Sequence, residues 1–338
     1  MKSDWENRPW ALRVRKIYGI AMNVIPWISC VLLVGFMVGL SELLDQREII
    51  FPEITALAIG YVVAPKRSWK VNGRRMWLLI TGCAIGGLVI VRYVPVSYYL
   101  QIMIAFTVAQ ILYAVSRTTL APFVSAIVLP VVLQSDSIVY PIAASLLTLA
   151  IVLLHEGLVI LEVRQDEEFI PSVNLNKDAV LGTIGRIVCT AILVWISIKM
   201  DWIFVISPPL LVAFTEFSRR GHPARKKPLR IVAFMTFAAL TGSICRYVLT
   251  MRMGMHLMVA AMVATVILLF VVKRSGMFMP PAGAVVILAM LISEDRVMVF
   301  PLQILLGITL IMMITILLFT DRYGIIKKKA HPLNAGEE

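Results

Sequence analysis

Four short apolar segments of this sequence begin with proline and carry small or polar residues in their first turn. They read Phe51-Pro52-Glu53-Ile54-Thr55-Ala56, Ala121-Pro122-Phe123-Val124-Ser125-Ala126, Ser207-Pro208-Pro209-Leu210-Leu211-Val212-Ala213 and Met279-Pro280-Pro281-Ala282-Gly283-Ala284. Proline is preset for the first helical turn, and a helix that starts inside a bilayer presents its positive dipole end there. Such an end attracts an anion, and transporters use converging helix ends of this kind near the membrane midplane. We therefore predict a site for a small anion at the starts of these segments.

The candidate substrate-binding residues are the prolines, their small neighbours and four arginines at the ends of apolar segments. They are Pro52, Thr55, Pro122, Ser125, Ser207, Pro208, Pro209, Met279, Pro280, Pro281 and Gly283, with Arg92, Arg117, Arg246 and Arg274. A guanidinium carries a permanent charge that could draw or bind an anion. Arginines at helix ends also commonly extend to the lipid headgroups, so that alternative stays open. Arg186 lies well inside its segment and must be paired or hydrated.

Glu53 directly follows Pro52, where the helix dipole favours a carboxylate that would compete with an anionic substrate. Two interpretations remain: a proton-coupling group, or an ordinary helix acid near the outer surface. We predict no catalytic residue, metal or cofactor. His155-Glu156 lacks the second histidine of a metalloprotease motif, and the four cysteines show no paired spacing.

Membrane helices must position these residues. Of 338 residues, 59% are hydrophobic and 15% charged, whereas soluble domains are nearer half apolar and a quarter charged. The pattern predicts an all-α polytopic protein without a soluble domain. Its twelve apolar segments cover residues 19–43, 49–64, 76–95, 98–115, 119–134, 138–161, 178–199, 202–217, 229–249, 255–273, 278–293 and 298–320.

Basic residues predict the orientation. If the N-terminus is cytoplasmic and every segment crosses, 25 Lys and Arg lie inside and 6 outside, which is the positive-inside pattern. Both termini should then be cytoplasmic in a multi-pass plasma-membrane protein. Residues 1–18 should form a basic interfacial segment, and Lys327-Lys328-Lys329 a basic tail that contacts anionic lipid. The expected partners are a small anionic solute and lipids but not nucleic acid, and the chain could also form a homo-oligomer.

The spacing of the prolines indicates an internal repeat. Pro52 and Pro122 are 70 residues apart and Pro209 and Pro280 are 71 apart, while the two sets are offset by 157 and 158 residues. Residues 1–162 and 163–338 should thus be two parallel membrane repeats of six segments. Within each, two three-segment units should form an inverted pair, because three crossings reverse direction.

The second half carries a resemblance to a known family. The residues are Ile206-Ser207-Pro208-Pro209, Pro228-Leu229-Arg230, Gly242 and Met279-Pro280-Pro281-Ala282-Gly283-Ala284. This pattern resembles the HPP family of integral membrane proteins, named for a His-Pro-Pro signature followed by Ala/Gly-Gly-Ala, and the first half looks like a diverged copy. The resemblance implies anion transport, with nitrite as the family's described substrate. Met279 stands where the signature histidine would be, so membrane transport carries over and nitrite itself does not.

The sequence as a whole predicts a transporter, not an enzyme, for a nitrite-like inorganic anion or a small carboxylate. One three-segment unit would rock against its partner around the site. The alternatives are a channel for a neutral solute such as urea or ammonia, and a membrane enzyme or flippase that handles lipid-linked phosphate. An enzyme would need a clustered acid, base or metal set, which the basic inner loops at 65–75 and 218–230 do not offer.

Overall fold

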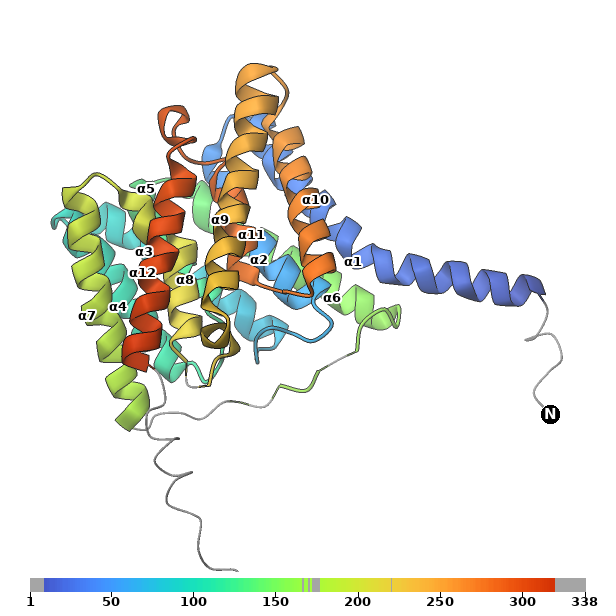
Figure 1. The fold of residues 1–338 in the computed structure, drawn as a ribbon, viewed down its shortest axis with the longest axis horizontal. Coiled ribbons are helices and arrows are strands. Elements are labelled where there is room, and N and C mark those ends of the chain that lie inside the picture. The colour runs from blue at the N-terminus through green and yellow to red at the C-terminus, as the bar shows by residue number, and fades with distance from the viewer. Residues whose placement is uncertain (1–8, 166, 170, 172–176, 220, 320–338) are drawn as a thin grey trace, which may run out of the picture.

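The computed structural model describes the backbone of residues 9–165, 167–169, 171, 177–219 and 221–319, and side chains from residue 24 onward apart from residues 177 and 178. Within these residues the chain is entirely helical (Figure 1). The predictions for the side chains of residues 1–18 and for the tail at Lys327-Lys328-Lys329 lie outside the described residues.

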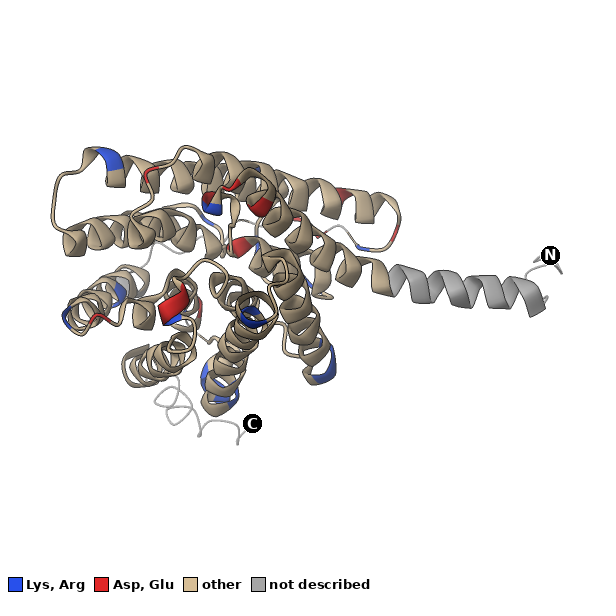
Figure 2. Cartoon of the chain, turned by 90° about the horizontal axis from the view of Figure 1, so that it is seen from above, with Lys and Arg blue, Asp and Glu red and all other residues tan. Residues whose placement is uncertain are grey.

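Within the described part of the chain, eight helices are long and apolar enough to cross a membrane. They are α1 (Pro9–Leu44, with Val24–Leu44 as the apolar span), α3 (Gly73–Tyr93), α4 (Tyr98–Val115), α6 (Val139–Ile160), α7 (Lys177–Lys199), α9 (Pro228–Cys245, extended by the π-helix Arg246–Arg252), α10 (Leu257–Ser275) and α12 (Phe300–Phe319). Their ribbon is mostly uncharged (Figure 2). A hydrocarbon core of roughly 30 Å takes about 20 such residues, so the chain is a multi-pass membrane protein.

The four proline-led segments form short helices. These are α2 (Glu53–Leu57, continued by the π-helix Ala58–Val63), α5 (Pro122–Leu133), α8 (Pro208–Phe217) and α11 (Pro280–Leu288). At 1.5 Å per residue, none of them can cross a bilayer as a helix. Almost every residue of the four is buried, so their backbone polar groups do not face lipid. Helix ends inside a bilayer are tolerated only when they are buried in protein or line a water-filled cavity.

The short helices pack on one another and the long helices surround them (Figure 1). α2 contacts α11 and α5, while α8 contacts α5 and α11. Around them, α3 packs on α5 and α6, α9 packs on α11 and α12, α1 packs on α10, and α4 packs on α7. Helices from the two halves of the sequence therefore interlock through both their short and their long members.

The short helices α2 and α8 each follow a 3-10 lead-in that begins near one end of a long helix. Arg47 and Glu48, before α2, line the same pocket as Tyr140 at the start of α6. Beyond the other end of α6, Arg164 donates a hydrogen bond of 2.8 Å to the carbonyl of Val62. The segment from Arg47 to Val62 thus runs the length of a candidate membrane span.

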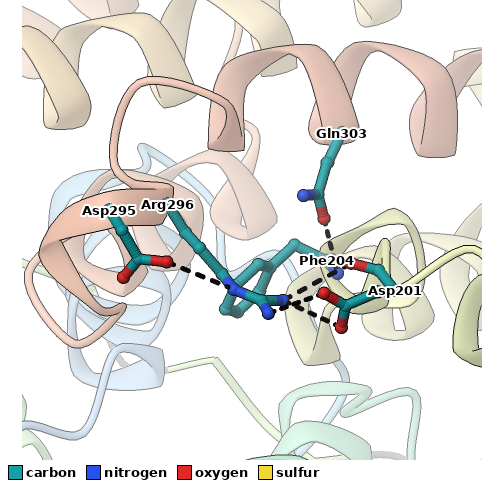
Figure 3. Close-up of polar contacts among 5 residues, drawn as sticks. All are labelled: Asp201, Phe204, Asp295, Arg296 and Gln303. Atoms are coloured by element: carbon teal, nitrogen blue, oxygen red, sulfur yellow. Dashed lines mark hydrogen bonds and ion pairs between the residues drawn. The ribbon is translucent and has the colours of Figure 1, made fainter.

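The corresponding segment of the second half runs along α12 in the same way. The N–H of Phe204, in the 3-10 helix Ile203–Ile206 that precedes α8, donates to Gln303 Oε1 at 2.9 Å, near the start of α12 (Figure 3). Phe214 packs against Phe319 at the end of α12, with 5.9 Å between ring centroids. Arg296, just before α12, holds the same lead-in through hydrogen bonds of 2.8 and 3.2 Å to the carboxylate of Asp201 (Figure 3).

Candidate functional site

The first turns of three short helices meet in the buried centre of the protein. The hydroxyl of Ser125 in α5 donates a hydrogen bond to Glu53 Oε1 in α2. Gly283 in α11 lies against Thr55 and Ile59, because a Cβ at this glycine would come within 3.1 Å of the Thr55 carbonyl carbon and 2.8 Å of Ile59 Cδ1. The predicted residues Thr55, Ser125 and Gly283 are thus brought together, with Glu53 among them.

The starts of the four short helices share one feature: their N-cap side chain does not bond to the first turn. The N-cap residues are Pro52, Ala121, Ser207 and Met279. Helix starts are usually satisfied by a Ser, Thr, Asp or Asn side chain, or by a ligand. These four positive dipole ends are therefore left without a side-chain cap of their own, inside the protein.

The doubled prolines change what α8 and α11 can offer a ligand. Pro208, Pro209, Pro280 and Pro281 supply no N–H groups, and the next amides bond to preceding carbonyl oxygens. Leu210 and Leu211 both donate to the carbonyl of Ser207, and Ala282 donates to that of Met279. In the second half the helix ends therefore act through their dipoles and through hydroxyl groups, not through free amides.

Several polar side-chain atoms at these helix starts are buried without a hydrogen-bond partner among the described residues. They are Glu53 Oε2, Thr55 Oγ1 and Ser207 Oγ, in side chains that are 0 to 1% exposed. Leaving such an atom unsatisfied costs roughly 1–3 kcal/mol, so native proteins rarely do so without a reason. A bound polar ligand, or an ordered water in its place, would satisfy these atoms.

An arginine guanidinium sits at the opposite, C-terminal end of each short helix. Arg164 donates to the carbonyls of Val62 and Val63 (2.8 and 2.5 Å), Arg92 to that of Asp136 (2.7 Å), Arg225 to that of Arg219 (2.7 Å), and Arg246 to those of Ala289 and Ile292 (2.7 and 2.5 Å). These cations offset the negative ends of the four helix dipoles. The positive ends are buried and have no comparable set of carboxylates among the described residues, so they favour negative charge.

The four arginines proposed for substrate binding lie elsewhere. Arg92 bonds to the carbonyl of Asp136, three residues beyond α5, and Arg246 bonds to the carbonyls of Ala289 and Ile292, just beyond α11. Arg117 and Arg274 are exposed, in the segments that lead into α5 and α11. The structure does not bring any of these four side chains into the cluster of helix starts, whereas Met279 and the six prolines are buried.

Arg186 belongs to a separate buried network that sequence reasoning only partly anticipated. Its Nε donates to Gln110 Oε1 at 2.6 Å and its Nη2 to Thr183 Oγ1 at 2.8 Å. Gln110 in turn donates to Thr215 Oγ1 at 2.8 Å. The network joins α4, α7 and α8 through neutral acceptors, which accounts for a charged side chain well inside a membrane helix.

A pocket of about 270 Å³ opens beside the start of α2. Its wall consists of Arg47, Glu48, Ile50, Leu129, Pro130, Leu133, Gln134, Ser135, Asp136, Tyr140 and Leu291. Tyr140 also donates a hydrogen bond of 2.9 Å to the carbonyl of Ala126 and packs edge-on against Phe51, with ring centroids 6.0 Å apart. Ile50, Phe51 and Tyr140 thus connect this pocket to the neighbourhood of Glu53.

Comparison with protein-family models, with curated proteins and with solved structures gave no match. The resemblance to the HPP family therefore rests on the residues quoted from the sequence. Among the described residues, no group of three or more His, Cys, Asp or Glu side chains is placed to hold a metal ion. The described cluster of helix starts offers helix dipoles, hydroxyl groups and one carboxyl group.

Sequence reasoning named Gly242 but missed its pairing with Gly87, and it missed Tyr140. Gly87 of α3 and Gly242 of α9 allow the backbones of α5 and α11 to approach closely, against the carbonyls of Ile127 and Val286. Tyr140, which lines the pocket and bonds α5, stands out in the sequence only as one aromatic residue among many. The offset of Gly87 and Gly242, close to that of the prolines, was the signal that could have identified the pair.

Proposed function

We propose that this protein is a transporter of a small anion in the plasma membrane, with both termini in the cytoplasm. The observation that carries the proposal is the polarity of the four short helices. Their starts are buried and have no side-chain cap, unsatisfied polar atoms lie at the starts of α2 and α8, and the first turns of α2, α5 and α11 are in contact. Such an arrangement favours an anion near the middle of a membrane protein.

The packing supports the proposed pair of parallel six-segment repeats. If α7 to α12 repeat α1 to α6, the contact of α1 with α10 corresponds to that of α7 with α4, and α2 with α11 corresponds to α8 with α5; all four contacts exist. Gly87 against Ile127 likewise corresponds to Gly242 against Val286. The lead-ins of α2 and α8, which run beside α6 and α12, support two of the crossings of the proposed twelve-segment topology, each made of an extended half and a short helix.

The site favours a small monovalent anion. The nearby donors are hydroxyl groups such as those of Ser125 and Ser207, and the described first turns contain no lysine or arginine. A multiply charged anion would need such cations to offset its desolvation. Nitrite and formate are planar ions of suitable size and charge to test first.

The proposal is tested by flux into proteoliposomes that contain the purified protein. Uptake of nitrite or formate above the leak of protein-free liposomes is expected, together with stabilisation of the protein by the same anion in a thermal-shift series. Gly283→Val should abolish uptake, because the added side chain fills the contact of α11 with Thr55 and Ile59. Gly82→Val is the matched control, since a Cβ at Gly82 meets no atom within 4 Å. Unchanged flux in Gly283→Val would overturn the site assignment.

One observation favours a second function, a channel for a neutral solute such as urea. The unsatisfied hydroxyls of Thr55 and Ser207 could form hydrogen bonds with a neutral ligand. The described first turns contain no lysine or arginine whose charge an anion would have to balance. In the same proteoliposomes, urea flux without a response to any anion would select this alternative.

A further inference from the structure

The carboxyl group of Glu53 occupies the place that the proposed function assigns to a substrate anion. One oxygen accepts the hydrogen bond of Ser125, and the other has no partner among the described residues. The side chain is 1% exposed and lies in the first turn of α2, next to the first turns of α5 and α11. A carboxylate at this position accepts a hydrogen bond from a hydroxyl group and interacts with the positive ends of helices. A bound anion would make the same interactions.

Among the described side chains, the elements packed on α2 present no cation bonded to this carboxylate that would hold it permanently charged. α6 presents Tyr140, the titratable group that interacts with Glu53, and α5 presents Ser125. α1 contributes Met37, whose sulfur accepts the N–H of Phe51, and α11 contributes Gly283 at Thr55. In the π-helix that continues α2, the titratable residue is Tyr61, two turns beyond Glu53. A buried carboxyl group without a paired cation can exchange a proton at modest energetic cost, unlike one in an ion pair.

Only the first half contains this arrangement. If Pro52 corresponds to Pro209 and Pro122 to Pro280, Leu210 takes the place of Glu53 and Gly283 takes the place of Ser125. The carboxyl and its hydroxyl donor are thus a matched pair, present together in one half and replaced together in the other. A purely structural helix acid would not explain why its donor on another helix is replaced with it.

We propose that Glu53 is a built-in competitor for the substrate anion, and that its protonation couples anion uptake to the movement of one proton. The carboxylate takes a proton, which reaches it from water in the pocket that Ile50 and Tyr140 line. Its hydrogen bond from Ser125 breaks, and the hydroxyl donates to the incoming anion instead. On release of the anion the proton leaves Glu53 and the original bond re-forms. One proton and one monovalent anion cross together, so the cycle moves no net charge.

This inference rests on the proposed anion transport, and the experiment separates the two. Wild-type proteoliposomes receive nitrite or formate while a trapped pH dye reports proton entry and the membrane voltage is set with potassium and valinomycin. We expect proton entry in step with the anion, no effect of voltage, and about tenfold accumulation of the anion for an imposed gradient of one pH unit. Glu53→Gln keeps an oxygen that can accept from Ser125 but carries no charge, so it should equilibrate the anion without accumulation and respond to voltage.

Glu216→Gln is the matched control, because Glu216 is also a buried carboxyl group on a short helix but bonds to Trp69 away from the helix starts. It should accumulate the anion as the wild type does. Wild-type anion flux without proton entry, or accumulation by Glu53→Gln, would overturn the inference while leaving anion transport intact. No anion flux in the wild type would overturn both. If Glu53→Gln does not fold, the wild-type dye measurement alone decides.

Discussion

The indole N–H of Trp69 donates a hydrogen bond of 2.6 Å to Glu216 Oε1, across 147 residues of sequence. Both side chains are buried, at 2% and 6% exposure. Trp69 lies in the loop between α2 and α3, and Glu216 lies in the last turn of α8, so the bond ties the first half of the chain to the second. It also gives the buried carboxyl group of Glu216 a hydrogen-bond donor.

We predict that Trp69→Phe lowers the free energy of unfolding by about 1–3 kcal/mol, because it leaves a buried carboxyl group without its donor and removes indole contacts. Glu216→Gln should have a smaller effect, since its amide oxygen can still accept the bond. The measurement is thermal unfolding of the two variants in the same detergent. Equal stability of Trp69→Phe and wild type would show that the bond contributes nothing.

Arg246 should act on stability more than on anion affinity. Arg246→Ala removes two hydrogen bonds to the carbonyl end of α11, and we expect it to lower the stability by about 1–3 kcal/mol. Arg274→Ala should change little, because Arg274 is exposed. Thermal unfolding and anion titration are measured for both variants. A loss of anion affinity in Arg246→Ala without a loss of stability would contradict this prediction and support a role of Arg246 in substrate binding.

We predict that a side chain at Gly87 or at Gly242 destabilises the protein to a similar extent. A Cβ at Gly87 or Gly242 would press against the backbone carbonyl of Ile127 or Val286, which has little freedom to move inside a helix pair. We expect Gly87→Ala and Gly242→Ala each to cost about 1–3 kcal/mol by overpacking. Gly82→Ala, on the same helix as Gly87, faces open space and should not destabilise. The comparison requires only unfolding temperatures, and a neutral Gly242→Ala would contradict the close approach of α9 and α11.

We predict that His222 makes the free energy of unfolding fall in acid. Burial, together with Arg219 and Arg225, lowers the pKa of His222 from 6.5 to about 4, in the loop between α8 and α9. The folded state therefore holds the imidazole neutral, while the unfolded chain binds a proton near pH 6.5. Stability from this residue is present above that pH and is lost as the pH falls toward 4. His222→Gln should flatten the pH dependence of the unfolding temperature in this window; an unchanged slope would rule out His222 as its source.

The sequence alone identified the membrane class and the elements that matter. A run of about 20 apolar residues has few alternatives to a membrane helix, so composition and hydropathy were sufficient for the eight long helices. Proline fixed the starts of the four short helices, since it is compatible with a first turn and incompatible with the turns that follow. The sequence marked Thr55, Ser125 and Gly283 as residues of helix starts, but it did not predict that Gly283 of the second half would lie against Thr55 of the first.

Only the tertiary structure decided the roles of the charged residues. An arginine at a helix end has the same local sequence whether it reaches lipid, a substrate or a distant carbonyl, and the partners of Arg92 and Arg246 lie 44 and 43 residues away. The same holds for Glu53. The sequence predicted its place at a helix start, but not the hydroxyl group of Ser125, 72 residues later, that bonds to it. Local propensity and hydropathy act over a few residues, whereas the pairing of polar groups in a membrane core depends on which helices meet.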